Sequence, residues 1–291
     1  MSAIYKTQEG QHLVEGRYRD LLARWPVPSE QRSIATSLGH AFVVTCGPAS
    51  SPPVVLLQGS GANAAMWLRH IATLSASHRV YCVDVIGEPG LSSPSRPRLD
   101  AGTYAGWLEE VFDALGLGSA ALVGVSLGGW LALAFATIEP QRVSRLVLVS
   151  PSGIGRAKFS FFFKAVPLML MGRWGRRRAL ALAVGPTRPK LDALSIEIGR
   201  FAALISGHFK PRRELVPVFS DAALCRLTMP VLAIIGGQDA LLDSNDTRRR
   251  LEMLVGQATI RLLPDAGHVI MSETDTVGSF LSGNAELPAE V

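Results

Sequence analysis

A serine between two glycines is the clearest chemical signal in this chain. Gly124-Val125-Ser126-Leu127-Gly128 has the G-x-S-x-G pattern and lies between a β-favouring run, 121–125, and a helical pattern, 127–138. A bare G-x-S-x-G arises often by chance. In a strand-turn-helix setting, however, the glycines permit close packing and the sharp turn exposes the serine hydroxyl. We therefore predict that Ser126 is a nucleophile, with a structural turn as the alternative.

A serine hydroxyl is a weak nucleophile and needs a base with an orienting acid. Asp239 follows the apolar run 231–235, and His268 follows the run 259–263. Both residues therefore come just after predicted strands, as Ser126 does. The combination predicts acyl transfer, with Ser126 as nucleophile, His268 as general base and Asp239 as the acid that orients it.

Other acids and histidines fit these roles less well. Asp243 and Asp246 fall where a helix should begin, so we expect them to act at its N-terminus. His208 lies in a helical segment where it could contact a substrate. The four remaining histidines fall in predicted helices or edge positions, and they are His12, His40, His70 and His78.

Short apolar runs without polar alternation are typical of strands that are covered on both faces. Six such runs occur, at 54–57, 79–85, 121–125, 146–149, 231–235 and 259–263. Helical patterns lie at 64–75, 104–115, 127–138, 244–255 and 271–281, and a helix at 11–24 and a hairpin at 33–46 precede them. This alternation predicts an α/β fold with a mostly parallel, doubly wound sheet. Ligands bind such sheets at the carboxyl ends of the strands.

One long segment interrupts the alternation. Between 150 and 229 there are helical patterns, arginines and prolines but no run that favours a strand. We therefore divide the chain into a first core part, 1–151, a helical insertion, 152–228, and a second core part, 229–291.

Composition limits the other classes of function. The 291 residues are 48% apolar and 18% charged, which is typical of a packed globular protein. The net charge is +5, but the basic clusters form no stripe with interleaved aromatics, so we expect no nucleic-acid partner. The longest apolar stretch, 159–171, is shorter than the roughly 20 residues that span a bilayer. Without a secretory signal pattern we expect a cytoplasmic location.

The order Ser, Asp, His and the strand-end positions resemble the α/β-hydrolase superfamily over residues 34–281. Within it the chain is similar to small bacterial carboxylesterase-like hydrolases that carry a helical cap between the sixth and seventh strands. The resemblance implies that the insertion at 152–228 is this cap.

The resemblance also implies an oxyanion hole, the pair of N–H donors that binds the negative oxygen of the tetrahedral intermediate. Family members have a His-Gly-x turn after the first buried parallel strand, and this chain has Gln58-Gly59-Ser60 there. The matching donors are the backbone N–H groups of Ser60 and Leu127. Gln58 departs from the usual histidine, which leaves open what orients the loop.

A second stretch, 84–92, resembles the Asp-x-x-Gly-x-Gly-x-Ser turn of the family with one residue added. We expect it to be scaffold, with Glu88 as a lesser candidate participant. The chain has no nucleotide-phosphate loop, no H-E-x-x-H and no G-x-G-x-x-G that opens a βαβ unit. We therefore expect neither a cofactor nor a metal.

These observations predict a serine hydrolase that cleaves a small or medium apolar carboxylic ester through an acyl-enzyme. Two alternatives use the same fold: carbon-carbon bond or thioester hydrolysis by the same triad, and a catalytically weak ligand-binding protein. Candidate substrate contacts are Trp130, Phe162, Met169 and His208. The apolar residues of the cap have two other interpretations, packing onto the core and contact with a membrane surface. The sequence carries no signal of an oligomeric state.

Overall fold

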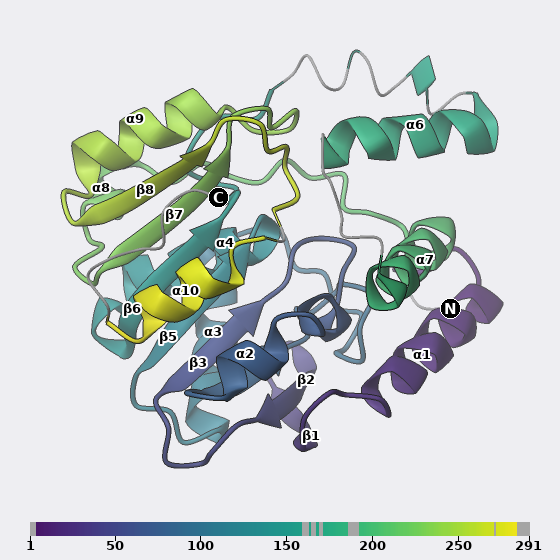
Figure 1. Cartoon of the computed structure of the whole chain (residues 1–291), viewed down its shortest axis with the longest axis horizontal. Helices are drawn as coiled ribbons and strands as arrows, with labels where there is room; N and C mark the ends of the chain where they lie inside the picture. Colours follow the sequence, from purple (N-terminus) through teal and green to yellow (C-terminus); the bar gives the residue numbers. More distant parts are fainter. Residues whose placement is uncertain are drawn as a thin grey trace.

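The computed structural model describes residues 4–158, 163, 167–168, 171–185, 192–270 and 272–283. Within these residues an eight-stranded sheet forms the centre of the molecule, in the order β1-β2-β4-β3-β5-β6-β7-β8 (Figure 1). β1 pairs antiparallel with β2, and β2 pairs antiparallel with β4. All pairs from β4 to β8 are parallel. The predicted α/β class with a mostly parallel sheet is therefore confirmed.

The strands lie within a few residues of the predicted apolar runs. Their bounds are β1 Ser29–Thr36, β2 Gly39–Cys46, β3 Pro53–Leu57, β4 Arg79–Val83, β5 Ala120–Val125, β6 Val143–Val149, β7 Val231–Gly236 and β8 Ala258–Leu263. The predicted hairpin forms β1 and β2 at one edge of the sheet.

Helices cover both faces of the sheet, which explains why the strand sequences are continuously apolar. In β3, Val55 and Leu57 belong to one buried cluster, and Val54 and Leu56 belong to another. The first cluster includes side chains of α3 Ala101–Ala114, α4 Leu127–Ile138, α8 Asp221–Leu224 and α9 Ser244–Leu254. The second includes side chains of α1 Gln8–Leu22, α2 Ile71–Ser75, α7 Ala193–His208 and α10 Thr274–Leu281.

The helix predicted at 64–75 is interrupted. It forms a 3-10 turn, η1 Ala64–Trp67, and the short helix α2. The side chain of Asn63 accepts a hydrogen bond from the Ala65 amide and donates one to the Pro89 carbonyl, so η1 is tied to the turn after β4. Hydrophobic periodicity cannot predict this contact, because its two residues belong to segments that are distant along the chain. A second 3-10 turn, η2 Pro140–Arg142, precedes β6.

The described part of the segment between β6 and β7 is helical. It contains α6 Gly172–Val184, α7 and α8, and it includes no strand longer than an isolated bridge. The division of the chain at 151 and 228 stays a prediction. Among the described helices, none is both long and apolar enough to cross a bilayer.

The amino-terminal segment is joined to the end of α7. The Lys6 amide donates to the His208 carbonyl, and the Lys210 amide donates to the Ile4 carbonyl, each at 2.8 Å. α1 lies beside α7 along this contact (Figure 1). The first helix of the chain therefore supports α7, in the segment between β6 and β7.

His70, just before α2, is a buried titratable group. Its ring packs edge-to-face on Trp67, and its Nδ1 hydrogen-bonds with the Thr274 hydroxyl of α10. Burial lowers the pKa of His70 from 6.5 to about 4, and the neighbouring Arg69 cation adds to the decrease. The folded protein therefore keeps this imidazole neutral in mild acid.

This environment predicts an acid-sensitive stability. In the unfolded chain His70 is protonated below about pH 6.5, whereas in the folded chain it is protonated only below about pH 4. The free energy of unfolding therefore decreases as the pH falls from 6.5 to 4. From pH 7.5 to pH 5 we expect this group to cost about 2 kcal/mol of unfolding free energy. Urea unfolding at both pH values should show a smaller loss in His70→Gln than in wild type. An equal loss in the two proteins would contradict the prediction.

Candidate active site

The turn at Ser126 joins the end of β5 to the start of α4. Ser126 has φ 51° and ψ −110°, a region that non-glycine residues rarely adopt and that costs about 1–3 kcal/mol. Its amide donates to the Val149 carbonyl at 3.0 Å. A Cβ on Gly128 would lie 2.1 Å from the Leu57 carbonyl oxygen, and one on Gly124 would lie 2.4 Å from the Gly128 carbonyl oxygen. Both glycines are therefore required by close backbone packing.

The structure brings Ser126, His268 and Asp239 together at the carboxyl ends of β5, β8 and β7. His268 Nε2 lies 2.9 Å from Ser126 Oγ, and His268 Nδ1 lies 2.7 Å from Asp239 Oδ2. An ionised carboxylate can only accept, so Nδ1 carries the proton and Nε2 is free to accept from the serine hydroxyl. This is the hydrogen-bond order required for general-base activation of a serine.

Asp239 is held by donors on both sides. It is 3% exposed, and its Oδ1 accepts from the amides of Leu241 and Leu242 at 2.7 and 3.0 Å. The Lys158 ammonium donates to the Asp239 backbone carbonyl at 2.8 Å. Because every partner of the carboxylate donates, the ionised form is satisfied and one oxygen is left to face His268. Lys158 had no marker in the sequence.

The rival acids have other partners. The Asp243 side chain accepts from the amides of Asn245 and Asp246 and so caps α9, as we predicted. The Asp246 carboxylate accepts from the Arg156 amide and pairs with Arg249.

The loop expected to supply oxyanion donors lies beside the nucleophile. A Cβ on Gly59 would lie 3.5 Å from the Cβ of Ser126. Gln58 is buried, and its amide, oriented to satisfy both partners, donates to the Val83 carbonyl at 2.7 Å and accepts from the Val85 amide at 2.6 Å. Gln58 therefore ties this loop to the segment that follows β4.

Glu88 also reaches this loop, although we expected its segment to be scaffold. Its Oε2 accepts from the Ser60 hydroxyl at 3.0 Å and from the Gly61 amide at 2.7 Å. The sequence feature that could have indicated this contact is the acidic residue in the Gly-Glu-Pro-Gly turn, which has one residue more than the family pattern.

The structure places the first predicted substrate contact, Trp130, in the core. Trp130 is 1% exposed, packs on Tyr104 and Phe219, and donates from its indole to the Pro217 carbonyl at 3.0 Å. Core packing thus accounts for the placement of the Trp130 ring, and a substrate contact there stays a prediction.

The imidazole of His208 faces α1, where a Cβ on Gly10 would lie 2.5 Å from its Nδ1. Its packing is therefore explained by the contact between α7 and α1, and a substrate contact there stays a prediction. Phe162 and Met169 lie outside the described residues.

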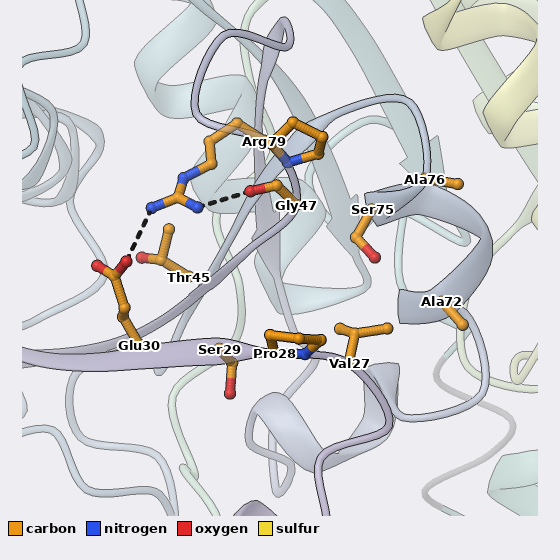
Figure 2. A pocket seen from close by; sticks show the side chains of 11 residues that line it. Val27, Pro28, Ser29, Glu30, Thr45, Gly47, Ala72, Ser75, Ala76 and Arg79 are labelled. Carbon is orange, nitrogen blue, oxygen red and sulfur yellow. Dashed lines mark hydrogen bonds and ion pairs between the residues drawn. The ribbon is translucent and has the colours of Figure 1, made fainter.

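An open hollow of about 510 Å³ lies at the opposite end of the sheet (Figure 2). Arg79, at the start of β4, marks it as the amino end of the parallel strands, whereas the triad is at the carboxyl ends. The Arg79 guanidinium donates to the Gly47 carbonyl at 2.6 Å and pairs with Glu30 at 3.6 Å (Figure 2). These contacts satisfy the cation, and the hollow is separate from the candidate site.

Comparison with known proteins places this geometry in a family. A family model described as the alpha/beta hydrolase fold matches residues 52–206. Carboxylesterase YbfK of Bacillus subtilis (strain 168) is 31% identical over 277 residues, which is 91% of this chain and 92% of that protein. Its crystal structure superposes with a TM-score of 0.77 at 28% identity over 95% of this chain and 96% of that one.

A second solved structure, naproxen esterase (carboxylesterase NP) from Bacillus subtilis, has a TM-score of 0.80 at 25% identity. The alignment covers 96% of this chain and 98% of that one. The family model and the superposed structures agree with the mostly parallel sheet flanked by helices. The chain therefore belongs to the α/β-hydrolase family, and it resembles the bacterial carboxylesterases of that family.

Proposed function

We propose that this hydrolase cleaves a small or medium apolar carboxylic ester through an acyl-enzyme on Ser126. The observation that carries the proposal is the pair of hydrogen bonds that joins Asp239 to His268 and His268 to Ser126. The two solved relatives are named as carboxylesterases, which favours an ester over a thioester or a carbon-carbon bond.

In the proposed mechanism, His268 Nε2 takes the hydroxyl proton as Ser126 Oγ attacks the ester carbonyl. Asp239 keeps the imidazole in the required tautomer and stabilises the imidazolium that forms. The amides of Ser60 and Leu127 bind the oxyanion, and one such donor is worth roughly 3 kcal/mol in the transition state. His268 then protonates the departing alcohol.

Deacylation repeats the same steps with water. His268 takes a proton from a water molecule as it attacks the acyl-enzyme, and the tetrahedral intermediate again places its negative oxygen between the Ser60 and Leu127 amides. Collapse of this intermediate releases the carboxylic acid and returns the proton to Ser126.

The structure gives less reason to favour the alternative of a catalytically weak ligand-binding protein. It depended on Gln58 leaving the oxyanion loop without an orienting contact. Gln58 instead makes two hydrogen bonds to the segment after β4, so the replacement of histidine is compatible with an ordered loop.

Ser126→Ala and His268→Ala should each reduce kcat on an aryl ester by about 10⁴-fold or more, because each removes a member of the proton-transfer unit. Circular dichroism and the thermal midpoint should stay close to wild type. Mass spectrometry after a fluorophosphonate probe should find label on Ser126 in wild type and none in Ser126→Ala. Wild-type turnover in either variant would refute the assignment.

Asp239→Asn should reduce kcat by about 10⁴-fold, since an amide facing His268 favours the wrong imidazole tautomer. Asp243→Asn is a matched control in the same loop, because asparagine also caps helices well. We expect the control to keep wild-type kcat and stability. Equal activity in the two variants would show that Asp239 has no special role.

A panel of substrates tests the bond that is cleaved. We expect kcat/KM to be highest for short and medium aryl or alkyl esters, lower for acyl thioesters, and lowest for vinylogous diketones that require carbon-carbon cleavage. Single-turnover trapping of the acyl-enzyme would identify the acyl group. A preference for the diketones would support the carbon-carbon alternative instead.

A further inference from the structure

Two fully buried carboxylates lie in the turn after β4, and they have different partners. Asp84 accepts from the Tyr18 hydroxyl at 3.0 Å, the Ala64 amide at 2.9 Å and the Leu91 amide at 2.8 Å. These bonds join α1, η1 and the turn itself. Asp84 is therefore explained as scaffold.

Glu88 is 0% exposed and contacts the loop beside the nucleophile. Its Oε2 receives both the Ser60 hydroxyl and the Gly61 amide. Gly59, the residue before Ser60, lies beside the nucleophile, since a Cβ built on it would lie 3.5 Å from the Cβ of Ser126. A single carboxylate oxygen thus binds the loop at Ser60, the residue whose backbone N–H is the expected oxyanion donor.

Two arginines offset the charge of Glu88. The Arg212 side chain is 9% exposed, and its Nε lies 3.5 Å from Glu88 Oε1, which is long for a hydrogen bond but close for an ion pair. Arg212 also donates to the Pro97 carbonyl and to the Tyr104 hydroxyl. Arg96 donates to the Gly87 carbonyl, next to Glu88 in the chain.

Burial and the neighbouring donors act in opposite directions on the pKa of Glu88. Burial raises the pKa of Glu88, while the Gly61 amide, Arg96, Arg212 and the Ser60 hydroxyl act in the opposite direction. An uncompensated carboxylate here would repel the developing oxyanion across a short distance of low polarity. The arginines offset the charge of Glu88 and so reduce this repulsion.

We propose that Glu88 is a positioning residue for the oxyanion hole. Its carboxylate holds Ser60 and Gly61 so that the Ser60 N–H points toward the negative oxygen formed at Ser126, and Arg212 balances its charge. This inference rests on the proposed ester hydrolysis. It adds a residue that acts through the loop and does not touch the substrate.

The test compares Glu88→Ala and Glu88→Gln with the scaffold control Asp84→Asn. Each variant would be assayed for kcat and KM on an aryl ester and for thermal midpoint. Inhibition would be measured with a trifluoromethyl ketone, which forms a tetrahedral oxyanion adduct with serine, and with the product alcohol, which forms none.

In Glu88→Ala we expect kcat to fall by about tenfold to a hundredfold with KM changed less than about threefold, because the loss is confined to the transition state. The inhibition constant of the ketone should rise by the same factor, and that of the alcohol should stay unchanged. Glu88→Gln should fall between Glu88→Ala and wild type, since its amide oxygen still accepts from Gly61. Asp84→Asn should lower the thermal midpoint and leave kcat and ketone affinity unchanged.

The outcomes separate the two proposals. Wild type that hydrolyses esters, together with Glu88 variants that keep its kcat and ketone affinity, would overturn the role of Glu88 alone. Wild type that neither turns over esters nor takes a fluorophosphonate label would overturn the proposed function. An equal loss of ketone affinity in Asp84→Asn would overturn the specific role of Glu88, because any disturbance of the turn would then have the same effect.

Ser60→Ala tests the same contact independently, in case Glu88→Ala fails to fold. It removes one of the two bonds to Glu88 Oε2 and keeps the backbone donor, so kcat and ketone affinity should each fall by about two- to fivefold. Wild-type values in both Ser60→Ala and Glu88→Gln would refute the inference.

Discussion

The left-handed backbone of Ser126 is held in place by the packing of β5, α4 and the end of β3. A relaxed turn would remove about 1–3 kcal/mol of local strain, but it would separate Gly128 from the Leu57 carbonyl and displace α4 from the sheet. The apolar contacts of α4 on the sheet therefore maintain the strain. The hydroxyl consequently stands clear of the sheet edge, next to the free amides at the start of α4.

Three buried carboxylates lie around this turn, and the donors near each one decide what it can do. Burial raises the pKa of Asp84 to about 6, although two amides and the Tyr18 hydroxyl oppose the shift. Burial raises the pKa of Glu88 as well, and the Gly61 amide, two arginines and the Ser60 hydroxyl oppose the shift. Asp239 receives two amides on one oxygen, so its other oxygen is left for His268. Side chains of one chemical type thus have separate tasks because their partners differ.

The strands and the strand-end positions of Ser126, Asp239 and His268 were predictable because local patterns carry that information. Continuous apolar runs indicate buried strands, and glycine spacing indicates a tight turn. The same arguments did not predict that the helix at 64–75 is divided into η1 and α2. They also could not show that the Trp130 indole bonds to the Pro217 carbonyl, 87 residues away.

The sequence by itself determined the α/β class, the order of Ser126, Asp239 and His268 along the chain, and the placement of each after a strand. Parallel strands end at one edge of a sheet, so these positions follow from local pattern and chain order. Only the tertiary structure decided that Gln58 and Glu88 hold the loop after β3 and that Lys158 supports Asp239. Each of these contacts joins segments that are distant along the chain, and no local periodicity or motif records which side chains meet there.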